Sequence, residues 1–491
     1  MTNTKRNLAR GGALSFVGSA VSSVLGFLLT IYLANTLGDA GVGVVLQAMS
    51  AFTIALAVSK FGMDSTSIWM IPRLKLSDAR SIPGALVQMA CIVLTAGTVA
   101  VIILELFAPR FWHDSPEVIE AIRAVAWFLP AGALMLLMVS VLRALGNVRT
   151  YVLLDNIALP SLRLPVVMLA VIVGGSTTLV SAAWAVPTVI VLALCLTVLS
   201  RYIAPFREGP RPPMDWVRTR EIVKFALPRT ASAGMEQAIV WLGVLLVGIL
   251  AGSAAAGVYG GASRFVQAGL MIDSAIRVVV SPQFSSMLHL KDIKGVQNLY
   301  GIAAVWLVLF ATPIYIVLAF FAPVALSLLG PDFQSGRSSL IVLCIGAIIT
   351  FLAGNIHSVL LMSGRSGWAA FNKAVVLIIT VVGSLVLIPW IGFLGAAVTW
   401  AISMAADAAL AVIQVRTFVG VSMRLTEVLL PLGISLATFG LACTVACWVF
   451  GATWTGLIAA ILVGGVTYVA LCYTLRTRLN LDGLGQLVAR H

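Results

Sequence analysis

Long apolar segments separated by short polar breaks run along almost the whole chain. A helix crosses the hydrocarbon of a bilayer in about 20 residues. When each segment ends at a charged residue or a Pro/Gly cluster, the chain contains fourteen segments of that kind. They cover residues 13–34, 40–59, 83–107, 119–142, 151–173, 177–200, 228–251, 255–284, 297–322, 338–362, 370–391, 393–415, 428–450 and 454–475. This pattern predicts an all-α polytopic membrane protein with about fourteen transmembrane helices and no soluble domain.

The composition agrees with a membrane protein and excludes two other classes. Of 491 residues, 60% are hydrophobic and 10% are charged. Soluble domains carry about 25% charged residues, and one core could not hide this much apolar surface from water. The six cysteines lie in apolar runs without metal-ligand spacing, and no phosphate-binding loop or other catalytic motif is evident. We therefore expect a protein that is not an enzyme and that holds no metal or cofactor.

The charged residues are distributed unevenly between the loops. The chain has 31 Lys and Arg against 18 Asp and Glu, a net charge of +13. An even number of spans puts both termini on one side, and 24 of the cations then fall on that side, five inside spans and two, Arg110 and Arg337, opposite. Cytoplasmic loops carry such an excess of Lys and Arg. We therefore predict cytoplasmic termini, and the basic balance requires no nucleic-acid partner.

An internal repeat relates the two halves of the chain. At a shift of about 216 residues, Ala40-Gly41-Val42 matches Ala256-Gly257-Val258, Asn156 matches Asn372, and Trp184 matches Trp400. Each unit would contain six spans, so both would enter the membrane in the same orientation. Parallel repeats about an axis along the membrane normal are typical of transporters.

The repeat predicts how the chain divides into parts. Spans one to six would form an N-lobe, spans seven to twelve a C-lobe, and the last two spans an appendage with a cytoplasmic tail. The predicted boundaries are 1–200 for the N-lobe, 201–227 for a cytoplasmic linker, 228–418 for the C-lobe and 419–491 for the appendage.

Arginines inside the spans are the first candidates for a binding site. A central charge costs about 2.5–3.5 kcal/mol even on lenient insertion scales, so it indicates a partner or a water-filled cavity. Arg163 lies mid-span between Pro160 and Pro165, and Arg264 lies deep in the eighth span. The guanidinium fork suits phosphate, so we predict an anionic, phosphate-bearing substrate contacted by these two arginines. Arg229 and Arg277 are supporting candidates.

Acidic residues inside the spans are candidates for coupling transport to an ion. They are Glu236, Asp273 and Asp407. Asp273 and Arg277 are four residues apart and can pair on one helix face. Glu236 and Asp407 remain open between pairing with a buried arginine and acting as protonatable groups. His357 is read as a packing residue, and Lys60 and Asp64 as an interfacial pair.

Two motifs connect the chain to a known family. Tyr32–Gly43, with Leu37-Gly38, Asp39 and two further glycines, resembles the first-loop signature of the polysaccharide transporter family. Asn35 departs from it, because the family often has Arg there. Ser358–Arg365 resembles the family's tenth-span ending, where a Gly-Arg turn precedes the next helix.

The resemblance implies a fold and a function. The fold is the MATE-like one of the multidrug/oligosaccharidyl-lipid/polysaccharide (MOP) exporter superfamily, in which two six-helix lobes form a V around a central cavity. Similar members, the O-antigen-type flippases, move undecaprenyl-pyrophosphate-linked oligosaccharides across the bacterial cytoplasmic (inner) membrane by alternating access, for lipopolysaccharide and other surface polysaccharides. Membrane lipids, a coupling ion (proton or sodium) and a polysaccharide polymerase are the implied partners.

Three other functions stay open at this point. A lipid II flippase also has fourteen spans and a cationic cavity. A cation-coupled multidrug antiporter resembles a version with twelve spans, and the two additional helices here argue against it. A membrane scaffold for a glycan polymerase would need none of the intramembrane charges.

Overall fold

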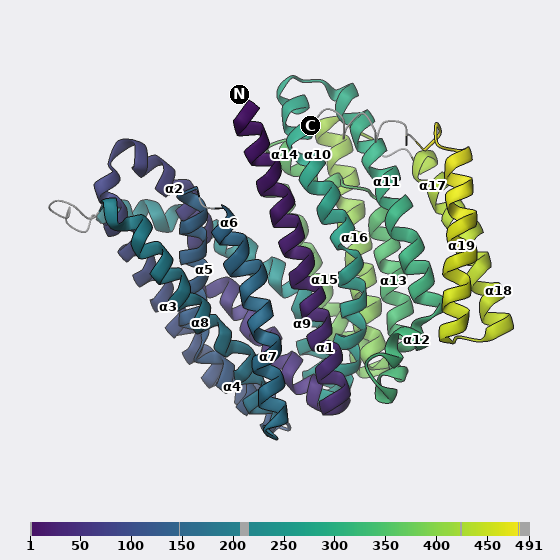
Figure 1. Ribbon diagram of the computed structural model, residues 1–491, viewed down its shortest axis with the longest axis horizontal. Coiled ribbons are helices and arrows are strands. Elements are labelled where there is room, and N and C mark those ends of the chain that lie inside the picture. The colour runs from purple at the N-terminus through teal and green to yellow at the C-terminus, as the bar shows by residue number, and fades with distance from the viewer. Residues whose placement is uncertain (1, 147, 207–215, 423–424, 480, 482–491) are drawn as a thin grey trace. The chain divides into compact units, whose positions relative to one another are not determined.

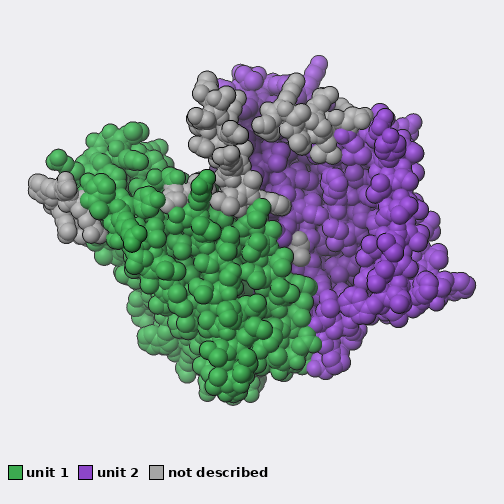
Figure 2. All heavy atoms as spheres, viewed as in Figure 1, with its two compact units in different colours: residues 1–257 green, residues 258–491 purple. Residues whose placement is uncertain are grey.

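The computed structural model describes all residues except 1, 147, 207–215, 423–424, 480 and 482–491. Helices account for nearly all of the described chain, and these residues form no strand (Figure 1). The all-helical prediction is therefore confirmed. The helices gather into two compact units, residues 1–257 (unit 1) and 258–491 (unit 2), coloured separately in Figure 2.

Unit 1 contains eight helices and most of a ninth. They are α1 (Thr2–Ser59), α2 (Met63–Ser77), α3 (Ile82–Phe111), α4 (Pro116–Ala126), α5 (Leu129–Ala144), α6 (Val148–Tyr151), α7 (Leu159–Ile172), α8 (Thr177–Ile203) and α9 (Trp216–Gly269), with short turns η1 (Ala79–Ser81), η2 (Val152–Ala158) and η3 (Ala204–Phe206). The core packs α2, α3, α5 and α8 together through residues such as Met89, Leu137 and Cys195. Residues 216–227 of the predicted linker belong to α9, and the division into lobes stays a prediction.

Unit 2 continues from the end of α9 with ten further helices. They are α10 (Met271–His289), α11 (Ile293–Phe320), α12 (Ala322–Ser327), α13 (Arg337–Leu352), α14 (Ile356–Met362), α15 (Ser366–Ile391), α16 (Phe393–Val419), α17 (Leu425–Ser435), α18 (Leu441–Phe450) and α19 (Trp454–Thr474), with turns η4 (Pro331–Gly336) and η5 (Leu436–Gly440). The last three helices pack on α11, where Tyr468 donates a hydrogen bond to the carbonyl of Leu309.

The helices are long and apolar enough to cross a membrane many times. Eleven segments qualify by length and composition, or twelve if α4 and α5, which meet at 43°, form one span. Two of these segments, Val17–Ser77 and Thr219–His289, are 61 and 71 residues long. At 1.5 Å per residue each exceeds roughly 90 Å, about three times the hydrocarbon thickness. Each is interrupted by a non-helical glycine, Gly38 or Gly252. Two crossings in each would bring twelve to fourteen, and that count stays a prediction.

Backbone at the edges of the two matched motifs approaches closely within unit 1. An added Cβ at Gly43 would lie 1.7 Å from the carbonyl oxygen of Ser253, and one at Gly257 would lie 2.0 Å from that of Asp39. Only a residue without a side chain allows two backbones to approach so closely. Beside this contact the buried amide of Gln47 donates to Ser253 Oγ (3.2 Å) and accepts from Trp112 Nε1 (2.6 Å).

The predicted tenth span is not one continuous helix. α13 ends at Leu352 and α14 begins at Ile356, because Gly354 adopts a φ of +61°. The hydroxyl of Tyr300 donates to the carbonyl of Ala353 (2.7 Å), which satisfies a backbone acceptor at the end of α13. This break places Asn355, His357 and Ser358 on a short separate helix.

A reciprocal amide pair joins α15 and α16. Asn372 and Gln414 are buried and exchange hydrogen bonds of 2.8 and 2.6 Å. Asn372→Leu should lower the free energy of unfolding by about 1–3 kcal/mol, because it leaves the Gln414 amide buried without a partner. The double change to leucine should recover part of that loss. Thermal melting in detergent would measure the cycle, and additive losses would contradict the coupling.

Candidate functional site

Arg163 lies on α7, directly after an irregular turn of the chain. The segment begins with the π-helical turn η2, and α7 follows with Pro160 in its first turn and Pro165 inside it. Proline removes a backbone donor and disturbs the ladder of hydrogen bonds, and π turns within helices occur frequently at functional sites. α7 continues as an α-helix through both prolines, so the irregular backbone near Arg163 is the π turn that precedes Pro160.

The Arg163 guanidinium rests on an aromatic ring, and its Nε has no hydrogen-bond acceptor in the described chain. Its carbon lies 4.0 Å from the ring centroid of Trp184 on α8, a buried residue whose ring also packs edge-on against Phe52. The side chain is half-buried, and Nε is buried with no hydrogen-bond partner among the described residues. A cation–π contact holds the charge in place and uses none of its N–H donors. The fork is therefore oriented by the protein and keeps hydrogen-bonding capacity.

Other charges of unit 1 lie around Arg163. Asp155 on η2 interacts electrostatically with Arg163 and with Lys60, and Lys60 pairs with Asp64 at 2.7 Å, as the spacing predicted. Arg229 is exposed on α9 and lies beside the turn between Lys60 and Asp64. A Cβ added at Gly62 in that turn would be 3.1 Å from the Cβ of Arg229. We call Arg163, Asp155, Lys60 and Asp64 the Arg163 cluster.

Arg123 in the same unit provides a contrast. Its Nε forms an ion pair with Glu105 Oε2 at 2.9 Å, joining α4 to α3. Both side chains are partly exposed. Arg123 therefore has a carboxylate partner within the protein.

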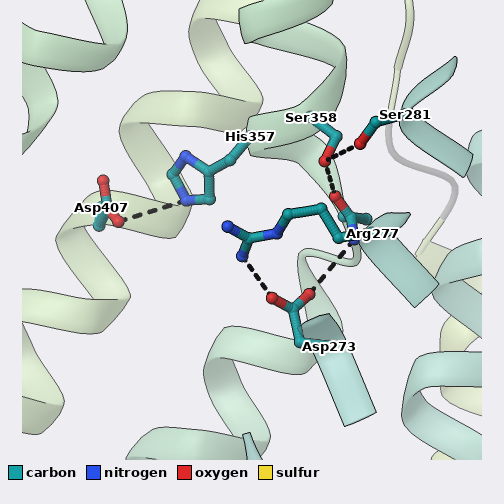
Figure 3. A network of polar contacts seen from close by, with 7 residues as sticks. Asp273, Arg277, Ser281, His357, Ser358 and Asp407 are labelled. Carbon is teal, nitrogen blue, oxygen red and sulfur yellow. Dashed lines mark hydrogen bonds and ion pairs between the residues drawn. The ribbon is translucent and has the colours of Figure 1, made fainter. Parts of the chain in front are cut away.

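Unit 2 holds a second polar network, shown in Figure 3. Asp273 and Arg277 on α10 form the ion pair that their spacing predicted. Asn355 donates to Asp273 Oδ1 (3.4 Å) and accepts from the Ser358 hydroxyl, which Ser281 reaches at 3.2 Å. Both oxygens of Asp273 therefore face donors, one from α10 and one from the break before α14.

The third acid of the prediction, Asp407, meets a histidine rather than an arginine. His357 Nε2 on α14 lies 3.2 Å from Asp407 Oδ2 on α16 (Figure 3). The other carboxylate oxygen, Oδ1, is buried without a hydrogen-bond partner among the described residues. The reading of His357 as a packing residue missed this pairing, because the two residues are fifty positions apart.

The two remaining predicted residues, Arg264 and Glu236, both lie on α9. Arg264 is half-buried on α9 in unit 2 and donates to Gln267 Oε1 at 3.1 Å. Glu236 is exposed on α9 in unit 1. The structure thus brings Asp273 and Arg277 together. In the part of the chain that it describes, no group of three or more His, Cys, Asp or Glu side chains is placed to hold a metal ion.

Solved structures with the same fold are flippases and transporters. A lipid II flippase, MurJ, in an inward closed conformation, matches with a TM-score of 0.75 at 13% identity, over 95% of this chain and 99% of that one. An inward-facing multidrug resistance MATE family transporter of the MOP superfamily matches with 0.65 at 14%, over 83% and 98%. A MOP superfamily transporter from Pyrococcus furiosus, described as having a binding pocket of reversed polarity, matches with 0.60 at 13%, over 85% and 96%. Identities this low establish the fold only.

The family follows from the sequence itself. The model of the family described as polysaccharide biosynthesis protein matches residues 8–288, more than half of the chain, so this chain belongs to that family. No curated protein matches. The chain is therefore a multi-pass membrane protein of a polysaccharide biosynthesis family with the fold of MOP flippases and transporters.

Proposed function

We propose that the protein is a flippase that moves an undecaprenyl-pyrophosphate-linked oligosaccharide across the bacterial cytoplasmic membrane by alternating access, for the synthesis of a cell-surface polysaccharide. The family supports the class of glycan, and the fold supports translocation rather than catalysis. The excess of cations on one side supports cytoplasmic termini. A polysaccharide polymerase would take the product on the other side.

The placement of the Arg163 guanidinium is the observation that supports this substrate. Trp184 holds the guanidinium while the buried Nε has no acceptor in the described chain. A pyrophosphate offers oxygens in the geometry that this fork binds. Phosphate is also the group that every lipid-linked oligosaccharide of this class presents, whatever its sugars are. We assign Arg163 to the pyrophosphate, with Arg264, Arg229 and Arg277 as further contacts, and Glu236, Asp273 and Asp407 to ion coupling.

Lipid II is the second candidate substrate. The match to a lipid II flippase over 95% of this chain favours it, and lipid II also carries a pyrophosphate, so Arg163 would serve equally. The two candidates differ in what the cell loses. A surface polysaccharide is dispensable for division in culture, whereas peptidoglycan is not.

Deletion of the gene in its own host is expected to remove a surface polysaccharide and to leave its lipid-linked precursor inside the cell. Extraction and mass spectrometry of undecaprenyl lipids would measure the precursor, and a plasmid copy should restore export. Growth arrest with accumulation of lipid II would favour the lipid II flippase instead. Sensitivity to cationic drugs with normal polysaccharide would favour a multidrug antiporter.

A further inference from the structure

His357 and Asp407 form the histidine–carboxylate pair that links α14 to α16. Nε2 and Oδ2 are 3.2 Å apart, and the side chains are 30% and 22% exposed. The glycine break before α14 and the bond from Tyr300 to Ala353 fix the helix that carries the imidazole. The pair is thus held by the fold, yet it is accessible to small species from outside the protein.

The two acids of the network differ in what faces them. Asp273 has Arg277 on one oxygen and the Asn355 amide on the other. Asp407 has His357 on one oxygen and no donor for the buried second oxygen in the described chain. A buried carboxylate oxygen without a donor is costly, and histidine is the side chain that ordinarily gains or loses a proton near neutral pH. Among the described residues, only the second acid is paired with a histidine.

The helices around α14 carry few other ionisable groups. α14 packs against α10, α11, α15 and α16, and α16 also packs against α13. The charged or titratable side chains on these helices, outside the pair itself and excluding tyrosine and cysteine, are Asp273, Arg277, His289, Lys294, Arg337, Lys373 and Arg416. Asp273 and Arg277 neutralise each other, so the network carries the charge of the pair, which is −1 with neutral imidazole and zero after it gains a proton.

We propose that His357 and Asp407 together bind the proton whose movement drives transport, which makes the proton, rather than sodium, the coupling ion. The step needs one proton from water on one side, which adds to the imidazole and turns the pair into imidazolium and carboxylate. The same proton leaves to water on the other side after the conformational change, and no other bond forms or breaks. This inference rests on the proposed transport function.

The donor set argues against sodium. Hard cations select several oxygen ligands. Here one oxygen of Asp407 already faces an imidazole nitrogen, and both oxygens of Asp273 face nitrogen donors. Of these four carboxylate oxygens, Asp407 Oδ1 has no donor in the described chain, and a single oxygen is too few for a hard cation, whereas a proton adds to the pair as it stands.

Flipping driven by imposed gradients would test the coupling. The purified full chain in liposomes would act on an undecaprenyl-pyrophosphate disaccharide with a fluorescent sugar, and dithionite quenching would report the leaflet. A pH gradient should raise the initial rate at least fivefold over no gradient, and a sodium gradient should not. In His357→Gln and Asp407→Asn that ratio should fall below two. His289→Gln and Asp332→Asn, exposed residues of the same unit, should keep it.

Stimulation by sodium, or an unchanged ratio in both variants, would overturn the proposal. If wild type does not flip this probe at all, the proposed substrate is wrong. A second measurement then tests the contact between His357 and Asp407 independently of transport. The chain has four histidines, so ¹⁵N-histidine spectra in nanodiscs resolve His357 by its loss in His357→Gln. Its ring ¹⁵N chemical shifts should change in Asp407→Asn and not in Asp332→Asn. Identical His357 signals in all three proteins would overturn the pairing.

Discussion

Arg163→Ala is expected to lower polysaccharide export at least tenfold while the amount of protein in the membrane stays normal. Hydrogen bonds to charged groups contribute about 1.5–3 kcal/mol, and each 1.4 kcal/mol corresponds to about a factor of ten. The alanine variant loses the guanidinium that would bind the pyrophosphate. Because Arg163 Nε has no acceptor in the described chain, its removal leaves no such acceptor unpaired. Surface polysaccharide per cell, normalised to membrane protein, would measure the effect.

Arg123→Ala is the matched control for this prediction. It removes another span arginine of unit 1, but an exposed one whose charge Glu105 already satisfies. Exposed pairs contribute about 0–1 kcal/mol, so export should stay within twofold. Arg163→Lys should restore only part of the activity, because an ammonium keeps the charge but not the bidentate fork. Equal losses in the two alanine variants would mean that Arg163 is no more than a structural charge.

Gly43→Ala is expected to give little folded protein. The added methyl group would lie 1.7 Å from the carbonyl oxygen of Ser253, and a backbone atom cannot rotate away. The two segments would have to separate, which would also pull Gln47 from Ser253. Overpacking of a core costs about 1–3 kcal/mol, and we expect the upper end or more here. Fluorescence-detected size exclusion and melting in detergent would measure folded yield and stability.

Gly26→Ala makes the same chemical change on the same helix. A Cβ at Gly26 meets nothing within 4 Å, and alanine is the better residue in a helix by about 0.5–1 kcal/mol. This variant should therefore melt no lower than the wild type. If Gly43→Ala behaves like Gly26→Ala, the close approach at the Ala-Gly-Val motif is not required for folding.

The membrane helices were predictable because a bilayer sets their length and apolarity. Apolar runs predict two crossings inside each of the 61- and 71-residue segments, which a helix assignment alone does not separate. The break at Gly354 was missed, because a single glycine within an apolar run does not reveal that its φ is positive. That conformation depends on the packing of Gly354 against Ala304 and on the bond from Tyr300.

Contacts within one helix could be predicted from the sequence, whereas contacts between helices could not. Pairs four residues apart, Lys60–Asp64 and Asp273–Arg277, follow from helix geometry and are confirmed. The contact of Arg163 with Trp184 and the pair of His357 with Asp407 join different helices. Spacing along the chain carries no signal for such contacts. The repeat match of Trp184 to Trp400 was the one indication that Trp184 occupies a special position.

Translocation of a lipid-linked oligosaccharide by the purified chain would establish that the protein is a flippase for such lipids. Liposomes would contain either the undecaprenyl-pyrophosphate disaccharide or lipid II, each labelled on the sugar, together with wild type, Arg163→Ala or Arg123→Ala. We expect wild type and Arg123→Ala to move the disaccharide lipid faster than lipid II, and Arg163→Ala to move it at least tenfold more slowly than wild type. Preference for lipid II, or equal rates for Arg163→Ala and wild type, would contradict the account.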